Sequence, residues 1–380
     1  MVDTTTREIT ENETKEAPQK HITSPKIRSY VRFDSLTAIP VLFKDNFTKL
    51  PKWEFEDIYV RSEEERRPVC TKSLQLSKDE DFQKATLWNI QLWLHEDHLD
   101  MNEWNRLAHF NNPFGFMEYH SNDIIPVADL IPKPIFPQML AVPEDALDGC
   151  IRCAVVGTGG ILNGSKMGKE IDSHHYVFRV NGAVIKGHEE DVGNRTDVYV
   201  HTSFSLSQGM ITLKEYGFNR IPQDEGIIYV MIPEGLRDFE WLDGLLERKT
   251  VTRGSYAGYT PFSYYGDHLS EDRFYVLHPD FMRYIRNRFL KSESLESIYW
   301  HLFRPTNGAF ALFLALHTCD EVNAYGFITE DYDKYNNYYY EKASKTEVVF
   351  YINHDYSLEI KTWKKLHDLG IIKLYQRKET

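Results

Sequence analysis

From Cys150 onward, the sequence alternates short apolar runs with longer segments of helical pattern. Short runs with little polar interruption are typical of strands buried on both faces, and helical crossovers between them make neighbouring strands parallel. This alternation predicts an α/β fold with a mostly parallel, Rossmann-type sheet flanked by helices. The expected strands are Cys153–Gly157, Tyr176–Val180, Val198–Val200, Gly226–Ile232, Tyr275–Leu277, Val322–Gly326, Val348–Tyr351 and Ile371–Tyr375.

Helices are expected on both sides of Cys150. They are placed at Asp81–Leu94, Asn102–Ala108, Asp280–Lys291, Gly308–Thr318 and Tyr356–Leu369, the last followed by the helix-ending Gly370. Residues 28–149 are rich in aromatic residues and proline and are interpreted as an extension packed on a main domain at 150–380. Residues 1–27 contain no Phe, Trp or Tyr, so they cannot offset the entropy of ordering and are expected to be a flexible stem.

The composition limits the partners of this chain. Its 380 residues carry a formal net charge of −13, and the pI is near 5.6. A protein that neutralises nucleic-acid phosphates normally has a basic face, so nucleic-acid binding is disfavoured. The sequence has no run of about 18 apolar residues that could cross a bilayer, and no signal-peptide core at its N-terminus. The protein is therefore either cytosolic or separated from its targeting segment.

The four cysteines favour the second of these possibilities, a chain separated from its targeting segment. Cys150 and Cys153 form a C-x-x-C pair, but a zinc site would need a second ligand pair, and only the isolated Cys70 and Cys319 remain. Two structural disulfides are the favoured interpretation, and they require an oxidising compartment. Sequons for N-glycosylation agree with this, at Asn12, Asn46, Asn163 and Asn194.

The turn Gly157-Thr158-Gly159-Gly160 follows the first expected strand. Glycines let main-chain N–H groups approach a phosphate, so this turn is a candidate nucleotide site. A dinucleotide-binding enzyme would have a third glycine at position 162 and an acid at the end of the second strand. The sequence has Leu162 and Asn181 there, which makes an NAD-dependent oxidoreductase the least favoured function.

A second polar turn, Arg304-Pro-Thr-Asn-Gly308, leads directly into an apolar helix. Its hydroxyl, amide and N–H groups at a helix N-terminus can bind phosphate or carboxylate, although plain helix capping is the commoner role of such residues. Two such turns next to apolar segments of one sheet favour the anion site.

His354 lies just before the helix that contains Glu359. The positive end of a helix dipole favours the neutral imidazole, which can act as a base, although a lone histidine is more often structural. Asp331 and Asp333 resemble the acid pair by which many nucleotide-sugar transferases hold a divalent metal, but an ordinary solvated turn is the favoured interpretation. No metal site is predicted.

In this order, these segments resemble the four sialylmotifs of the animal sialyltransferase family. The run from Cys153 to Thr196 resembles the large motif, and the run from Arg304 to Ile328 resembles the small motif. Tyr338-Tyr-Tyr-Glu341 resembles the third motif, and His354 with Glu359 resembles the very small H-x-x-x-x-E motif. Four motifs in the correct order form a highly specific signal.

The resemblance implies a GT-A-like sialyltransferase fold, CMP-sialic acid as the donor substrate, and an inverting transfer that needs no metal or other cofactor. His354 would be the general base. The donor would bind to Thr158, Gly159 and Asn181 through its ribose and phosphate, to Thr306, Asn307 and Gly308 through its cytidine and sialic carboxylate, and to Tyr338 through the leaving phosphate. The family also pairs Cys153 with Cys319, which leaves Cys70 to pair with Cys150.

Within the family, Phe178–Gly187, His278–Phe281 and Leu366–Arg377 resemble the enzymes that sialylate O-linked N-acetylgalactosamine (GalNAc) at its 6-hydroxyl, and Arg237–Leu242 favours the first type of these enzymes over the second. The implied partner is a mucin-type glycoprotein or glycopeptide. The implied location is the Golgi lumen, as a type II membrane protein whose anchor is missing from this sequence.

Three motif positions depart from the family pattern. Thr158 stands where the family usually has Asn, Asn307 replaces a small hydroxyl residue, and Tyr338 replaces the commoner histidine of the third motif. A tyrosine can donate a hydrogen bond to the leaving phosphate but cannot carry a positive charge. These departures motivate one alternative, a catalytically weakened CMP- or glycan-binding protein. A sialyltransferase with a galactose acceptor is the other alternative.

Overall fold

The structure, a computed structural model, describes residues 37–380 except 65–66, 137, 343–344 and 378–380. The stem expected at residues 1–27 lies outside the described residues.

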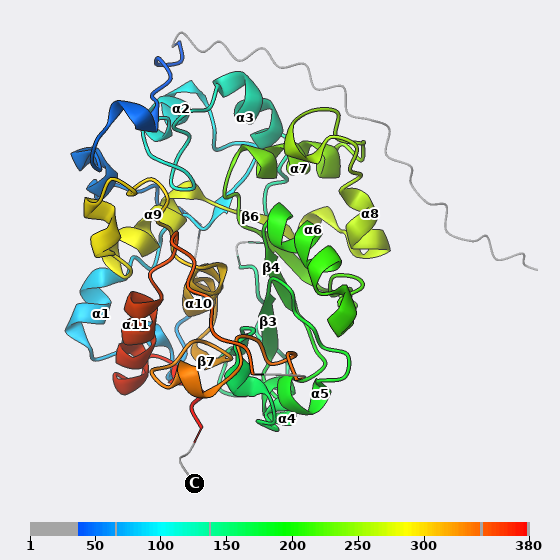
Figure 1. The fold of residues 1–380 in the computed structure, drawn as a ribbon. Helices are drawn as coiled ribbons and strands as arrows, with labels where there is room; N and C mark the ends of the chain where they lie inside the picture. Colours follow the sequence, from blue (N-terminus) through cyan, green and yellow to red (C-terminus); the bar gives the residue numbers. More distant parts are fainter. Residues whose placement is uncertain (1–36, 65–66, 137, 343–344, 378–380) are drawn as a thin grey trace, which may run out of the picture. The chain divides into compact units, whose positions relative to one another are not determined.

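A single mixed sheet organises the described part of the chain (Figure 1). Its strand order is β1-β6-β5-β4-β3-β2-β7-β8, and every neighbouring pair is parallel except β1 and β6. The mostly parallel α/β sheet predicted from the apolar runs is therefore confirmed. The strands are β1 (Trp93–Leu94), β2 (Arg152–Val156), β3 (Tyr176–Val180), β4 (Val198–His201), β5 (Ile228–Met231), β6 (Phe274–Leu277), β7 (Glu321–Tyr325) and β8 (Lys373–Leu374).

Helices cover both faces of the sheet. In Figure 1, α9, α10 and α11 lie to the left of the central strands, and α6, α7 and α8 lie to the right. None of the described helices is both long enough and apolar enough to cross a bilayer. The helices are α1 (Glu80–Ala85), α2 (Met101–Leu107), α3 (Ser121–Ala128), α4 (Gly168–Asp172), α5 (Glu189–Val192), α6 (Ser203–Thr212), α7 (Leu236–Leu246), α8 (Phe262–Tyr265), α9 (Pro279–Arg288), α10 (Asn307–Thr318) and α11 (Tyr356–Asp368).

Alternate residues of each central strand enter different hydrophobic cores. In β2, Val155 packs in the core that contains Phe310 of α10, whereas Ala154 and Val156 pack in the core that contains Trp241 of α7. A strand buried on both faces has no polar face, which explains why its sequence is apolar throughout.

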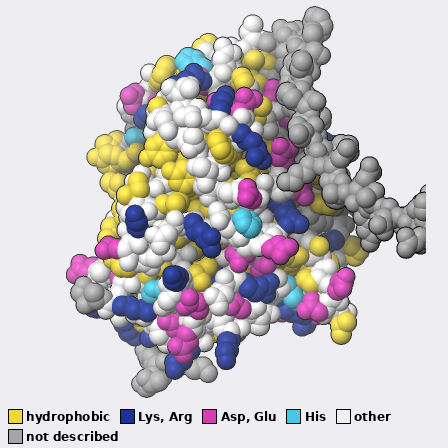
Figure 2. Space-filling view, turned by 90° about the vertical axis from the view of Figure 1, so that its right-hand side faces the viewer, with side chains coloured by type: hydrophobic (Ala, Val, Ile, Leu, Met, Phe, Trp, Pro, Cys, Tyr) yellow, Lys and Arg dark blue, Asp and Glu magenta, His cyan; other side chains and the backbone are white. Residues whose placement is uncertain are grey.

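Figure 2 shows the side of the molecule that lies to the right in Figure 1. Hydrophobic side chains gather in the upper half of this face, and basic and acidic side chains are interspersed over its lower half.

Two of the expected elements are wrong. The helix expected at Asp81–Leu94 ends as α1 at Ala85, and Trp93–Leu94 instead form β1, which pairs with β6 at the edge of the sheet. The strand expected at Val348–Tyr351 is an irregular segment, and the strand that pairs with the outer side of β7 is β8. Apolar content alone did not distinguish a strand from a surface loop.

Two disulfides fix the start of β2. Cys70 pairs with Cys150, with a Cα–Cα distance of 5.4 Å, and Cys153 pairs with Cys319 at the end of α10, with a Cα–Cα distance of 6.2 Å. This is the pairing that the resemblance implies. It joins the segment before the main sheet to β2, and β2 to α10.

Buried charges attach the N-terminal segment to α9. The Glu54 carboxylate is fully buried, where it accepts hydrogen bonds from Arg286 Nη1 at 3.0 Å and from the Asn111 main-chain N–H at 2.6 Å. Asp280, at the start of α9, accepts from Arg283 of the same helix at 2.9 Å and from Arg106 of α2 at 2.7 Å. These bonds join parts of the chain that are distant in sequence.

We expect Glu54→Ala to lower the free energy of unfolding by about 3–5 kcal/mol, because it leaves the buried Arg286 guanidinium without its carboxylate partner. Urea-induced unfolding measured by tryptophan fluorescence tests this. Glu80→Ala is the matched control, because Glu80 pairs with Lys84 on the exposed surface of α1. Equal unfolding midpoints for the two variants would contradict the structural importance of the buried pair.

Candidate active site

A cavity of about 830 Å³ opens where several elements of the sheet end. It is lined by the residues that follow β2, β3, β4 and β7 and by the first residues of α6 and α10. After β2 the chain adds strands on one side as far as β6, and β7 is then placed on the other side of β2. Ligands of open parallel sheets bind at such a reversal of strand order, outside the carboxyl ends of the strands.

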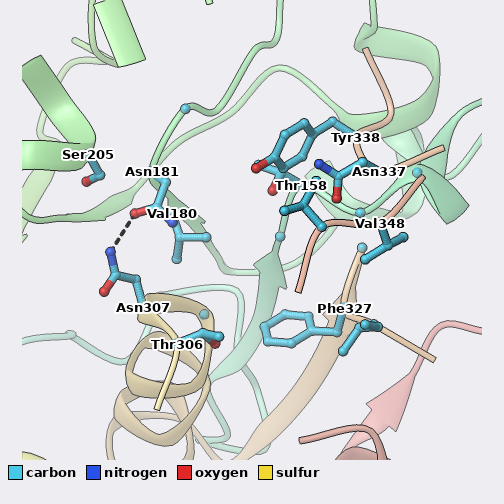
Figure 3. Close-up of a pocket in the computed structure, with 18 of the residues that line it drawn as sticks. Thr158, Val180, Asn181, Ser205, Thr306, Asn307, Phe327, Asn337, Tyr338 and Val348 are labelled. Atoms are coloured by element: carbon cyan, nitrogen blue, oxygen red, sulfur yellow. Dashed lines mark hydrogen bonds between the residues drawn. The ribbon is translucent and has the colours of Figure 1, made fainter. Parts of the chain in front are cut away.

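The residues predicted for donor binding and catalysis all line this one cavity. The structure therefore brings together four segments that are far apart in the sequence. The residues are Thr158, Gly159, Asn181, Thr306, Asn307, Gly308, Tyr338 and His354. Figure 3 labels Thr158, Asn181, Thr306, Asn307 and Tyr338 among these residues.

The glycine turn after β2 has a packing role that the sequence did not indicate. The N–H groups of Gly157 and Gly159 donate to the carbonyls of Tyr325 and Gly326, at 2.8 and 2.9 Å. A Cβ at either glycine would lie 2.7 Å from the Gly326 oxygen. These two glycines therefore allow the turn to pack against the end of β7, and their N–H groups are not free to bind phosphate.

Asn181 and Asn307 connect the large motif to the small motif. Asn181 follows β3 with φ at 52°, a left-handed conformation that asparagine tolerates better than most residues. Its Oδ1 accepts a hydrogen bond from Asn307 Nδ2 at 2.9 Å, drawn as the dashed line in Figure 3. Asn307 Oδ1 is buried and makes no hydrogen bond within the described part of the chain. One N–H of Nδ2 is used by Asn181, so Oδ1 is the wholly unused polar atom of this side chain.

Thr306 caps the N-terminus of α10. Its Oγ1 accepts from the Ala309 N–H at 3.1 Å and donates to Glu359 Oε2 at 2.8 Å, and its own N–H donates to Glu359 Oε1 at 2.8 Å. Desolvation of the buried Glu359 raises the pKa of its carboxyl to about 7, although both hydrogen bonds from Thr306 oppose this shift. The glutamate of the H-x-x-x-x-E motif thus holds the turn at 304–308 in place.

His354 lies just before the N-terminus of α11. Its Nδ1 donates to the Arg304 carbonyl at 2.8 Å, so Nε2 is the acceptor nitrogen, 3.2 Å from Asn353 Nδ2. Desolvation, together with the positive charge of Arg304, lowers the pKa of His354 to about 4. The imidazole is therefore neutral near pH 7 and has the tautomer that a base requires.

Tyr338 lies beside Thr158 and Asn337, across the cavity from Ser205 and Asn181 (Figure 3). Its ring stacks on Tyr340, with centroids 5.1 Å apart, and burial raises the pKa of its hydroxyl. The hydroxyl is protonated at neutral pH and can donate a hydrogen bond.

The Asp331 carboxylate already has partners in its own loop. Thr329 Oγ1 donates to one oxygen and Tyr335 Oη to the other, each at 2.7 Å. This agrees with a turn that is stabilised by its own side chains.

Sequence reasoning missed one wall of the cavity. Phe204 and Ser205, in the first turn of α6, line it together with the ion pair of Glu234 and Arg304. The capping residue Thr202 directly after the apolar β4 is a sequence signal that could have located this helix start.

Comparison with known proteins agrees with this geometry. Residues 93–371 match the family model described as Glycosyltransferase family 29 (sialyltransferase). The chain is 44% identical over 356 residues to alpha-N-acetylgalactosaminide alpha-2,6-sialyltransferase 1 of Gallus gallus, covering 92% of this chain and 63% of that protein. For the type 1 protein of Homo sapiens, the identity is 45%, and 87% of this chain and 56% of that protein are covered.

The type 2 relative of Mus musculus is 38% identical, over 86% of this chain and 88% of that protein. The higher identity to type 1 confirms the preference predicted from residues 237–242. The chain spans about 60% of the length of these type 1 relatives.

Solved structures show the same fold. The chain matches a crystal structure of a mammalian sialyltransferase with a TM-score of 0.57 and 23% identity, over 83% of this chain and 100% of that one. A mammalian sialyltransferase in complex with Gal-beta-1-3GalNAc-ortho-nitrophenol matches with a TM-score of 0.55, 22% identity, and coverage of 82% and 100%. By its family match, its relatives and its fold, the chain belongs to glycosyltransferase family 29, the sialyltransferase family.

Proposed function

We propose that the protein transfers sialic acid from CMP-sialic acid to the 6-hydroxyl of GalNAc that is O-linked to Ser or Thr, with inversion at the anomeric carbon. The observation that carries this proposal is the neutral His354, held by Arg304 in the cavity that the donor-binding motifs also line. The identity to alpha-2,6-sialyltransferases named for an α-N-acetylgalactosaminide acceptor supports the acceptor and the linkage.

His354 acts as the general base in this proposal. Its Nε2 takes the proton from the acceptor 6-hydroxyl while that oxygen forms a bond to the anomeric carbon of sialic acid. The bond from that carbon to the phosphate oxygen breaks, and CMP leaves with the electron pair. Attack opposite the leaving group inverts the anomeric carbon.

The donor-binding residues have separate roles. Thr158 and Asn181 contact the ribose and phosphate, and the Tyr338 hydroxyl donates to the leaving phosphate. Gly159 lines this part of the cavity, but its N–H is bonded to Gly326 and does not donate to the phosphate. Gly308 and the N-terminus of α10 face the sialic carboxylate, because anions are favoured at a helix N-terminus. Thr306 holds this turn in place, since its N–H and its hydroxyl both donate to Glu359. Asn307 contributes its free Oδ1, which can accept a hydrogen bond but cannot bind a carboxylate.

CMP is a monophosphate ester, which develops less charge on leaving than a nucleoside diphosphate does. We therefore expect the transfer to need no divalent metal. The two disulfides require an oxidising compartment, which supports a Golgi lumenal location with mucin-type glycoproteins as acceptors.

A second candidate function is a CMP- or glycan-binding protein with weakened catalysis. The departures at Thr158, Asn307 and Tyr338 motivate it, because all three residues line the cavity.

Incubation with CMP-sialic acid and a GalNAc-bearing glycopeptide should add one sialic acid, detected by mass spectrometry, and EDTA should leave the rate unchanged. Binding of CMP without transfer to any glycan would favour the second candidate. Transfer to galactosides alone would show that the acceptor is galactose rather than GalNAc. A large loss of transfer rate with EDTA would show that a divalent metal takes part.

His354→Ala should reduce the turnover number by about 10²–10⁴-fold, because it removes the general base. The Kd for CMP, measured by calorimetry, should stay close to that of the wild type. His268→Ala, at an exposed histidine, is the matched control and should retain full activity. The base assignment fails if His354→Ala keeps most of its turnover.

The pH dependence of transfer should reflect the low pKa of His354. The base works only when neutral, so activity should persist as pH falls below 6.5 and should decline as pH falls through about 4. Initial rates at subsaturating acceptor between pH 3.5 and 8, each after a stability check at that pH, test this expectation. An acid limb centred at 6.5 or above would contradict a desolvated His354 base.

A further inference from the structure

We infer that Phe204 and the Arg304–Glu234 pair form the acceptor subsite, which binds the GalNAc residue of the glycopeptide. This inference deepens the proposed function and depends on it. It assigns a wall of the cavity that the motifs for donor binding do not account for.

Phe204 presents an open aromatic face to the cavity. It lies in the first turn of α6, lines the cavity, and is 47% exposed. The Arg237 guanidinium lies 4.7 Å from its ring centroid. Arg237 does not itself line the cavity, whereas Phe204 does, so part of the ring is open to the cavity beside this cation–π contact. A fixed aromatic ring of this kind can stack on the C–H face of a hexose.

Glu234 holds the polar part of the subsite. Its side chain is only 6% exposed, and its two oxygens accept from Arg304 Nε and Nη2 at 3.1 and 3.2 Å. Oε2 also accepts from Arg237 Nη2 at 3.4 Å. Glu234 therefore positions two guanidinium groups, that of Arg304 and that of Arg237, which lies over the Phe204 ring.

Arg304 retains donors for a ligand. Its Nη1 makes no hydrogen bond to the residues that the structure describes, although Nε and Nη2 are both used by Glu234. A guanidinium donates and cannot accept, so its partner on a neutral sugar is an oxygen. The acetamido carbonyl is the strongest neutral acceptor on GalNAc, and galactose lacks this group. Arg304 thus provides a physical basis for preferring an N-acetylhexosamine.

The same arginine connects the subsite to the base. The Arg304 carbonyl accepts the Nδ1 proton of His354 at 2.8 Å, while its guanidinium faces the cavity. One residue therefore sets the position of both the base and the bound sugar. A hexose stacked on Phe204 and bonded to Arg304 shares the cavity with Nε2, the nitrogen that takes its 6-hydroxyl proton.

The test measures acceptor kinetics with a GalNAc-α-threonine glycopeptide at saturating CMP-sialic acid. Phe204→Ala should raise the acceptor KM roughly three- to tenfold, because it removes one aromatic stacking contact. The Kd for CMP and the rate of CMP-sialic acid hydrolysis without acceptor should not change. Phe204→Tyr should retain the wild-type acceptor KM.

Ile211→Ala is the matched control. Ile211 lies further along α6, is 62% exposed and does not line the cavity, so the variant should behave as the wild type does. Arg304→Lys loses the fork-shaped contact with Glu234, and it should lower the preference for GalNAc-peptides over galactosides. An unchanged acceptor KM in Phe204→Ala, or an unchanged preference in Arg304→Lys, would overturn the subsite.

Failure of the proposed function can be distinguished from failure of the subsite, because it is seen in the wild-type protein. A wild-type protein that transfers only to galactosides would refute both the GalNAc acceptor and the role of Arg304 in selecting it. Saturation-transfer NMR of the glycopeptide in the presence of CMP tests the subsite even without turnover. Contacts that persist in Phe204→Ala would reject the stacking role.

Discussion

The docking of α11 against the start of α10 determines the geometry of the cavity. Two sets of hydrogen bonds make this contact: Glu359 accepts from the main chain and hydroxyl of Thr306, and His354 donates to the Arg304 carbonyl. A buried carboxylate without donors would cost several kcal/mol, so Glu359 requires Thr306 in this position. The turn at 304–308 and the residue proposed as the base therefore cannot move independently.

Burial shifts the ionisation of this contact in opposite directions. It lowers the pKa of His354 to about 4 and raises the pKa of Glu359 to about 7, because desolvation disfavours the charged form of each group. The His354 imidazole in the cavity is therefore uncharged. Burial opposes ionisation of the Glu359 carboxyl group, whereas the two hydrogen bonds from Thr306 favour it.

The sequence predicted those features that depend on local pattern. Strands such as β2 and β3 are apolar because both faces are buried, and the turn at Thr306 is polar because it caps a helix. The edge strand β1 was missed, since two residues that pair with a distant strand have no periodicity of their own. The segment at 348–351 was assigned to a strand because it is apolar, although Val349, Phe350 and Tyr351 are exposed in an irregular segment.

The site shows the same division between local and long-range information. Motif resemblance identified His354 and the donor-side residues, whereas the wall formed by Phe204, Glu234 and Arg304 depends on contacts between β4, β5 and the start of α10. No short sequence pattern encodes an ion pair between residues 70 positions apart. The glycine turn after β2 was predicted to bind a phosphate through its main-chain N–H groups. In the structure, two of these N–H groups donate to the carbonyls of Tyr325 and Gly326 instead.

The three departures from the family pattern become intelligible when they are placed in the cavity. With Thr158 in place of asparagine, the turn after β2 contributes no side-chain amide, but Asn307 adds one on the opposite side and ties it to Asn181. The amide side chains of Asn181 and Asn307 are bonded to each other, and Asn307 Oδ1 is a buried acceptor. Tyr338 keeps a neutral donor beside Thr158 (Figure 3). These changes redistribute hydrogen-bonding groups around the ligand without adding charge, and they leave the contact between His354 and Arg304 intact.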